Sequence, residues 1–216
     1  MRGLLLDSKF MTILNRIGEL VILNICYLVC CIPIVTVGAA ITGLYTVCFR
    51  FGTARERGAL GSFFRAFLAN LKQGILLWLI GLAVGLFSAY FALLFFTMGG
   101  VIHYAFIPFL VLLALCLVVF SYAFPLLSQF ENTVAQTLKN AAILSLGYLP
   151  RSICIAAVNL LPVILLLFYP MLFLRIGILW FFLYFSAAAY LNTFLLRKVF
   201  TPYWPKEDGK EAEENA

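Results

Sequence analysis

Five long apolar blocks dominate the chain, and the shorter segments between them hold most of its charged residues. Each block is a continuous apolar run, without the alternation typical of a membrane barrel, and is long enough to cross a hydrocarbon core of about 30 Å as a helix. A helix also satisfies its own backbone polar groups in lipid. The pattern predicts an all-α fold, a polytopic integral membrane bundle of about five transmembrane helices. The predicted spans are residues 17–45, 74–98, 101–125, 153–169 and 171–196, in one domain over residues 1–200.

Pro33 interrupts the first block and leaves two topologies open. A proline has no backbone N–H and its ring collides with the preceding turn, so a helix bends or stops there. One kinked span over residues 17–45 is our prediction, because two half-length helices ending in lipid would leave backbone groups without partners. The alternative is a hairpin that turns back at Pro33. A signal peptide over residues 20–34 is a third interpretation, which the long leading segment with its acidic residues argues against.

Two amphipathic segments flank the spans. The first contains apolar residues that share one helical face behind a capping Asp7-Ser8 pair: Phe10, Ile13, Leu14 and Ile17. It predicts an N-terminal amphipathic helix that extends and anchors the first span. The second contains a stripe formed by Phe130, Val134, Leu138, Ala141 and Ala142. It predicts a cytoplasmic surface helix beginning near Glu131. After it and the last span, residues 201–216 carry an excess of acidic residues, which predicts a disordered tail.

The basic residues indicate an orientation but conflict at the N-terminus. Eleven of the 15 Lys and Arg residues lie in the linkers after the first and third spans and after the last span. The remaining four are Arg2, Lys9, Arg16 and Arg175. Because basic residues favour the cytoplasmic side, the linkers and the C-terminus are expected there, which puts the N-terminus outside for five spans. A hairpin at Pro33 would instead leave Arg175 alone on the outer side.

Composition supports the assignment to membrane proteins and argues against nucleic acid as a partner. Hydrophobic residues make up 64% of the 216 residues and charged residues 11%, against about 45–50% and about 25% in soluble domains. These proportions exclude a soluble fold and predict a multi-pass protein of the cell membrane. The net charge is +6, and the basic cluster between residues 50 and 72 is flanked by spans. We interpret that cluster as a topology signal and a contact with membrane lipids, and we expect no nucleic acid partner.

The predicted spans contain few side chains that could support catalysis, metal binding or ion coupling. His103 is the single histidine, and the six cysteines lie in or at the ends of apolar blocks, where they are best interpreted as small hydrophobes. No Asp, Glu or Lys lies deep in a span, although ion-coupled transporters and intramembrane proteases depend on such groups. A phosphate-binding glycine loop is also missing. We therefore predict no enzymatic activity, no catalytic or metal site and no cofactor.

Uncharged polar side chains remain inside the predicted spans: Asn24, Thr36, Thr42, Asn159 and Asn192. Such side chains form hydrogen bonds between helices, and small residues let helices approach closely. Hydrogen bonding for packing is our interpretation. The alternative is that these residues line an uncharged polar site.

Three runs carry a resemblance to a known family: CCIPIVTVGAA at residues 30–40, FENT at 130–133 and LPR at 149–151. They resemble the YesL family of uncharacterised bacterial membrane proteins, common in Gram-positive bacteria. The resemblance implies about five spans and genes that often neighbour carbohydrate-uptake genes. The motif residues matched here are Pro33, Thr36, Gly38, Ala39, Phe130, Glu131 and Asn132.

The Pro33 motif is open to two interpretations. Pro33 would bend the helix, Thr36 would bond a carbonyl freed by the bend, and Gly38 with Ala39 would let another helix approach. Such a bend serves either as a hinge kept for packing or as a broken helix around a solute site.

From the resemblance and the missing chemistry, we predict a non-enzymatic accessory or scaffold component linked to carbohydrate uptake. Its partners would be membrane lipids and either subunits of a sugar importer or a membrane sensor. The alternative is a facilitated permease for a neutral solute such as a sugar, using the uncharged polar residues around Pro33. The oligomeric state stays open.

Overall fold

The structure is a computed structural model that describes residues 2–52, 58–98 and 100–204. This part of the chain is all-helical and contains no strand. Five of its segments are long and apolar enough to cross a membrane, which fits a helical membrane bundle. They are Leu14–Cys31, Leu71–Thr97, Ile102–Gln129, Leu149–Phe168 and Gly177–Tyr203. Most of the predicted acidic tail, together with Arg55 and Arg57, lies outside the described residues.

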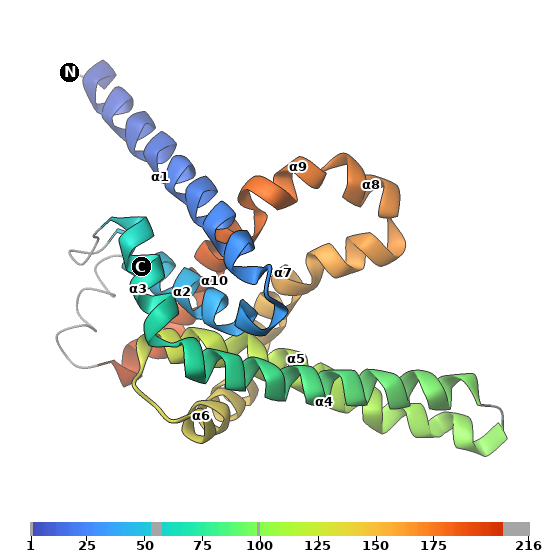
Figure 1. Cartoon of the computed structure of the whole chain (residues 1–216). Coiled ribbons are helices and arrows are strands. Elements are labelled where there is room, and N and C mark those ends of the chain that lie inside the picture. The colour runs from blue at the N-terminus through green and yellow to red at the C-terminus, as the bar shows by residue number, and fades with distance from the viewer. Residues whose placement is uncertain (1, 53–57, 99, 205–216) are drawn as a thin grey trace.

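The first apolar block forms two helices. Helix α1 (Arg2–Cys31) is followed by the short 3-10 turn η1 (Ile34–Thr36) and helix α2 (Val37–Arg50). α2 runs back beneath the second half of α1 (Figure 1). The single kinked span predicted for residues 17–45 is therefore corrected to a helical hairpin.

Hydrogen bonds within the turn explain why the hairpin is tolerated. The Thr36 hydroxyl donates to the Cys30 carbonyl at 2.6 Å and lies 2.7 Å from the Pro33 carbonyl. The Thr36 N–H donates to the Pro33 carbonyl at 2.9 Å, and the Ile32 N–H to the Val29 carbonyl at 3.2 Å. The turn thus supplies its own partners, which the prediction of a single span had assumed to be missing.

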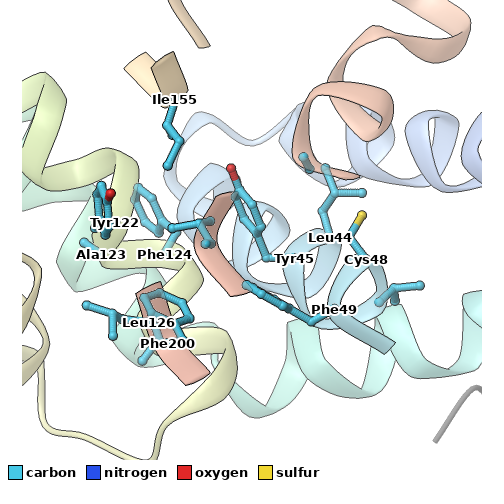
Figure 2. Close-up of a cluster of buried hydrophobic side chains, with 14 of the residues drawn as sticks. Leu44, Tyr45, Cys48, Phe49, Tyr122, Ala123, Phe124, Leu126, Ile155 and Phe200 are labelled. Carbon is cyan, nitrogen blue, oxygen red and sulfur yellow. The ribbon is translucent and has the colours of Figure 1, made fainter. Parts of the chain in front are cut away.

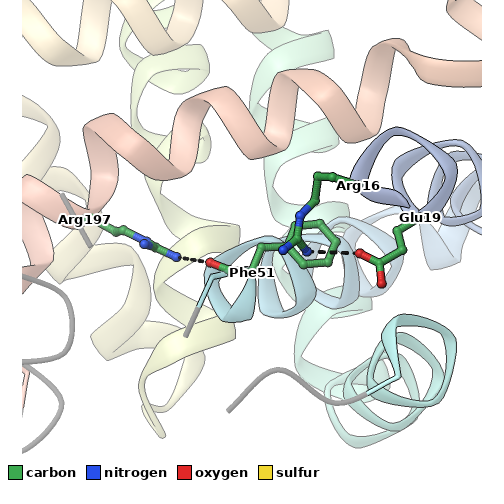
Figure 3. Close-up of polar contacts among 4 residues, drawn as sticks. All are labelled: Arg16, Glu19, Phe51 and Arg197. Atoms are coloured by element: carbon green, nitrogen blue, oxygen red, sulfur yellow. Dashed lines mark hydrogen bonds and ion pairs between the residues drawn. The ribbon is translucent and has the colours of Figure 1, made fainter. Parts of the chain in front are cut away.

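A contact between α1 and the end of α2 shows that the hairpin returns the chain to its starting level. The Arg16 guanidinium lies 4.0 Å from the centre of the Phe51 ring, and it pairs with Glu19 at 3.0 Å (Figure 3). Residue 51 follows α2 directly. Residues 16 and 51 therefore lie at the same end of the molecule, which a single crossing between them would not allow.

The N-terminal amphipathic segment is part of α1. This helix continues without a break from Arg2 to Cys31, so it does not begin at the predicted Asp7-Ser8 cap. The segment extends the first apolar helix, as the anchoring interpretation predicts.

α2 is the central element of the fold. Eleven of its 14 residues are buried, and its length of about 21 Å is short for a hydrocarbon core of about 30 Å. α1, α3, α4, α5 and α10 all pack against it. A short buried helix needs partners for its last carbonyl groups, because no turn of helix follows to bond them.

Arg197 supplies those partners at the C-terminal end of α2. One of its terminal nitrogens donates to the carbonyls of Phe49 and Phe51 at 2.8 and 2.9 Å, and the residue is only 5% exposed (Figure 3). A cation at a helix C-terminus also interacts favourably with the helix dipole. Arg197 therefore ties the last helix of the chain to the end of α2.

The other end of α2 lies against α4 with no space between the backbones. A Cβ on Gly38 would lie 2.2 Å from the Gly74 carbonyl oxygen, and one on Gly74 would lie 2.7 Å from the Ala39 Cα. Only glycine at both positions permits this approach.

The middle of the chain forms α3 (Ala59–Ala69), α4 (Leu71–Thr97), η2 (Gly100–Ala105), α5 (Phe106–Gln129) and α6 (Val134–Gly147). The apolar blocks do not predict α3, which packs its buried Phe63 against Gly43 of α2. α4 and α5 lie side by side and project from the rest of the molecule (Figure 1). α6 begins at Val134 rather than near Glu131, because Thr133 and Gln136 form a capping box.

The fourth predicted span, 153–169, lies in one unbroken helix, α7 (Leu149–Phe168). The region of the fifth comprises α8 (Pro170–Arg175), α9 (Gly177–Leu179), the π-helix η3 (Trp180–Tyr184), α10 (Phe185–Phe200) and η4 (Thr201–Tyr203). The fifth span therefore begins at Gly177 rather than at residue 171, and it runs on through the π-helix to Tyr203. Buried side chains of α2, α5, α7 and α10 meet in one hydrophobic core, shown in Figure 2 by Tyr45, Phe124, Ile155 and Phe200.

Replacing Gly38 with alanine tests the close approach of α2 and α4. We expect a loss of about 1–3 kcal/mol in the free energy of unfolding, because the nearest blocking atom is a backbone oxygen, that of Gly74, and cannot move aside cheaply. The measurement is thermal unfolding of the detergent-purified protein. Gly18→Ala on α1 is the matched control, since a Cβ there meets nothing within 4 Å and alanine favours helix. Equal stability of the two variants would contradict the packing.

Candidate functional site

A chain of uncharged polar side chains links four helices in the interior. The Asn192 amide of α10 donates to the Tyr45 hydroxyl of α2 at 3.2 Å and to the Asn159 amide oxygen of α7 at 2.9 Å. Asn159 donates to the Ser121 hydroxyl of α5 at 3.3 Å, and Ser121 donates to the Leu117 carbonyl at 2.8 Å. The predicted hydrogen bonding of Asn159 and Asn192 between helices is confirmed.

This polar chain is incomplete. Asn192 is fully buried, yet its amide oxygen has no hydrogen-bond partner. The Tyr45 hydroxyl accepts from Asn192, while its own proton is given to no group in the described structure. The indole N–H of Trp78 is buried and also unpaired. Buried polar atoms without partners are rare in proteins, so these atoms distinguish the region around Tyr45 from an ordinary apolar core.

A cavity of about 520 Å³ lies beside the polar chain. Residues of α1, α2, α4, α5, α7, η3 and α10 line it, and they include Tyr45, Trp78, Ser121 and Asn159. We call it the central cavity. Its volume is typical of small-molecule sites, which are mostly apolar with a few polar groups.

The wall of the central cavity carries no formal charge. None of its lining residues is Asp, Glu, His, Lys or Arg, and most are aliphatic or aromatic. Asn159 is exposed although it lies in the middle of α7, so its amide is accessible from the cavity. The cavity therefore suits an uncharged molecule, because an unpaired ion there would be costly.

Two interruptions in neighbouring helices border the cavity. Pro162 has no N–H for the carbonyl of Val158, and the hydroxyl of Tyr184, a lining residue, donates to that carbonyl instead. Phe185, another lining residue, follows the π-helix η3 directly. π-helical turns occur frequently at functional sites.

Asn24 of α1 holds this π-helix in place. Its amide nitrogen donates to the carbonyls of Trp180 and Phe181 at 3.3 and 2.7 Å. Its amide oxygen accepts the N–H of Ser186 at 2.9 Å, and the Ser186 hydroxyl donates to the Leu20 carbonyl at 2.7 Å. Asn24 therefore fastens the hairpin to the helix that carries Asn192.

The motif residues around Pro33 do not line the central cavity. Pro33 and Thr36 form the turn of the hairpin, Gly38 and Ala39 pack against α4, and Thr42 bonds the carbonyl of Gly38 in its own helix. The polar atoms at the Pro33 turn are therefore occupied by the turn itself, and the polar groups with remaining hydrogen-bonding capacity lie deeper in α2 and on α7.

Phe130, Glu131 and Asn132 lie at the opposite end of α2. Phe130 contacts Phe200 at 5.7 Å between ring centres, and Phe200 contacts Phe49 at 5.9 Å. Asn132 lines a surface groove of about 350 Å³ together with Asn140 and Tyr203. The structure thus separates the two groups of motif residues by the length of α2.

Sequence reasoning missed Tyr45, Trp78 and Ser121 as members of the site. Tyrosine and tryptophan are common in apolar blocks, and no local pattern distinguishes these two from core residues. Their partners lie up to 147 residues away in the sequence. Within the described residues, no group of three or more His, Cys, Asp or Glu side chains is placed to hold a metal ion.

Replacing Asn24 with leucine tests the attachment of the π-helix. The change removes the three hydrogen bonds that Asn24 makes to residues 180–186, so we expect a loss of about 2–4 kcal/mol in the free energy of unfolding. Hydrogen exchange of the amides in residues 180–186 should also become faster. Asn15→Leu, at an exposed position of the same helix, should change stability by less than about 0.5 kcal/mol. Unchanged exchange in that segment would contradict the role of Asn24.

Comparison with known proteins leaves the function open. Residues 20–91 match the sequence model of a family described as a protein of unknown function, DUF624. The match covers about a third of the chain, from the second half of α1 through α2 and α3 to most of α4. No curated protein and no solved structure matches the chain significantly.

Proposed function

We propose that this chain is a non-enzymatic, multi-pass protein of the cell membrane whose central cavity binds a neutral solute and lets it pass. The observation that carries the proposal is the incomplete polar chain beside an uncharged cavity. The lining residues Tyr45 and Asn159 have hydrogen-bonding capacity left over, because the Tyr45 proton has no acceptor and the Asn159 amide oxygen accepts only one bond. A neutral ligand with a polar group would use that capacity.

The same wall argues against coupling to an ion gradient. Coupled transporters carry an ionisable side chain where the ion or proton binds. The central cavity has none of Asp, Glu, His, Lys or Arg among its lining residues. Passage through it would therefore follow the concentration gradient of the solute.

The hairpin also bears on orientation. Arg16 and Arg197 both reach Phe51, so the basic N-terminal segment and the basic end of α10 lie together (Figure 3). We propose that α1 and α2 form a re-entrant hairpin and that this basic end faces the cytoplasm. Arg175 would then be the one basic residue on the outer side, which removes the conflict in the charge distribution.

The accessory role linked to carbohydrate uptake is the second candidate. The groove beside α6 favours this role. It is lined by Asn132, Asn140 and Tyr203 and lies at the basic end of the molecule, where a cytoplasmic partner would bind. The resemblance to the YesL family supports the same setting. Subunits of a sugar importer or a membrane sensor would be the partners.

Single cysteines in a cysteine-free background test the orientation. An impermeant maleimide applied to intact cells should label a cysteine at Arg175 only, and after permeabilisation it should also label those at Asn15, Lys139 and Lys198. All four positions are exposed. Labelling of Asn15 together with Arg175 from outside would restore the single kinked span and exclude the re-entrant hairpin.

The binding of neutral solutes tests the function. Purified protein should be stabilised against heating by uncharged sugars, polyols or long-chain alcohols and not by sugar phosphates or fatty acids. Tyr45→Phe should weaken that stabilisation, whereas Tyr203→Phe, which removes a hydroxyl outside the central cavity, should not. The solute that binds should also cross proteoliposomes faster than empty liposomes. Stabilisation by no neutral solute, with co-purification of importer subunits in mild detergent, would favour the accessory role.

A further inference from the structure

We infer that the neutral solute is a lipid alcohol, a molecule with one hydroxyl head and a long apolar body, rather than a sugar. The inference rests on the proposed function and names the class of ligand that the central cavity takes. Three features carry it: the position of the polar atoms, their number, and the shape of the apolar part.

The polar atoms of the cavity lie towards one end. Trp78 of α4 and Ser121 of α5 lie at a similar level, because the Trp78 and Phe124 rings are 6.3 Å apart and Phe120 lies against Gly81. Beyond that level the lining residues on these two helices are apolar: Leu82, Gly85, Leu86, Ala89, Leu113 and Leu117, apart from Cys116, whose thiol donates to the Gly81 carbonyl. From Trp78 to Ala89 the rise along α4 is about 16 Å. The cavity is therefore polar at its inner end and apolar along this arm.

The number of free hydrogen-bonding groups fits one hydroxyl. The lining residue Tyr45 has an unpaired proton to donate. The amide oxygen of Asn159 has capacity to accept, whereas the unpaired atoms of Trp78 and Asn192 are enclosed by protein. A hydroxyl that accepts from Tyr45 and donates to Asn159 uses both groups, so a single head group satisfies them. A sugar brings several hydroxyls, and each one buried without a partner lowers affinity by about tenfold.

The apolar arm has room for a chain. A Cβ on Gly85 would meet no atom within 4 Å, although Gly85 lines the cavity. At Gly81, by contrast, a Cβ would meet the Phe120 ring at 2.8 Å. The arm is open towards the outside of the molecule, because its lining residue Leu86 is 66% exposed, and a larger side chain at Gly85 occupies part of it without displacing backbone.

Photo-crosslinking of the full-length protein in nanodiscs tests the inference. The probe is a diazirine derivative of hexadecan-1-ol, and the competitors are hexadecan-1-ol, hexadecane, palmitate and glucose. We expect hexadecan-1-ol to compete at least tenfold more strongly than the other three, with crosslinks on α4 and α5. Tyr45→Phe should weaken competition by hexadecan-1-ol about fivefold and leave competition by hexadecane unchanged. Tyr203→Phe should change neither.

A second pair of variants tests the arm without touching a polar group. Gly85→Leu should weaken competition by hexadecan-1-ol and leave competition by octan-1-ol nearly unchanged. Gly61→Leu is the same change at an exposed position of α3 and should affect neither. Equal competition by hexadecane would show ordinary bilayer chains in the cavity and overturn the inference. Competition by glucose alone would also overturn it while the proposed function stands. Competition by palmitate as strong as by the alcohol would overturn both.

Discussion

The fold depends on one constraint: a helix that stops or breaks among apolar residues must find hydrogen-bond partners within the protein. α2 shows it most clearly, because it is short and buried and its last carbonyls are bonded by Arg197 from the far end of the chain. In the same way, Thr36 bonds the Cys30 carbonyl at the turn around Pro33, and Asn24 bonds the Phe181 carbonyl in the π-helix η3. Each partner comes from a residue that composition alone would count as an isolated polar side chain.

The same constraint explains where the central cavity lies. Helices that stop or bend leave space between them, and here the π-helix and the short α2 both border one volume, to which α7 contributes Asn159. Tyr184 lines that volume and also bonds the carbonyl that Pro162 leaves free. The interruptions therefore create both the space and the polar atoms at its wall.

The sequence predicted those parts of the fold that depend on local pattern. The all-helical class and the hydrogen-bonding role of Asn159 and Asn192 follow from apolar runs and isolated polar residues. The sequence alone favours a single span over the hairpin, because the bonds of Thr36 that satisfy the turn and the contact of Arg16 with Phe51 appear only in the folded chain. Tyr45 and Trp78 left no signal, since their roles depend on which helices meet, and α3 was missed because its apolar stretch is too short for a span.

The proposed binding in the cavity and the proposed contact with a partner at the basic end would be physically connected through α10. Asn192 and Arg197 are five residues apart on this helix, about 7–8 Å along its axis. One holds the hydroxyl of Tyr45 and the other holds the end of α2, so both fix the same pair of helices. A partner that displaces the end of α10 must strain the bonds of Arg197 and shift Asn192 relative to Tyr45. A ligand that bonds to the polar chain would stabilise the present position of Asn192 beside Tyr45. Any coupling between ligand binding and partner binding would be reciprocal.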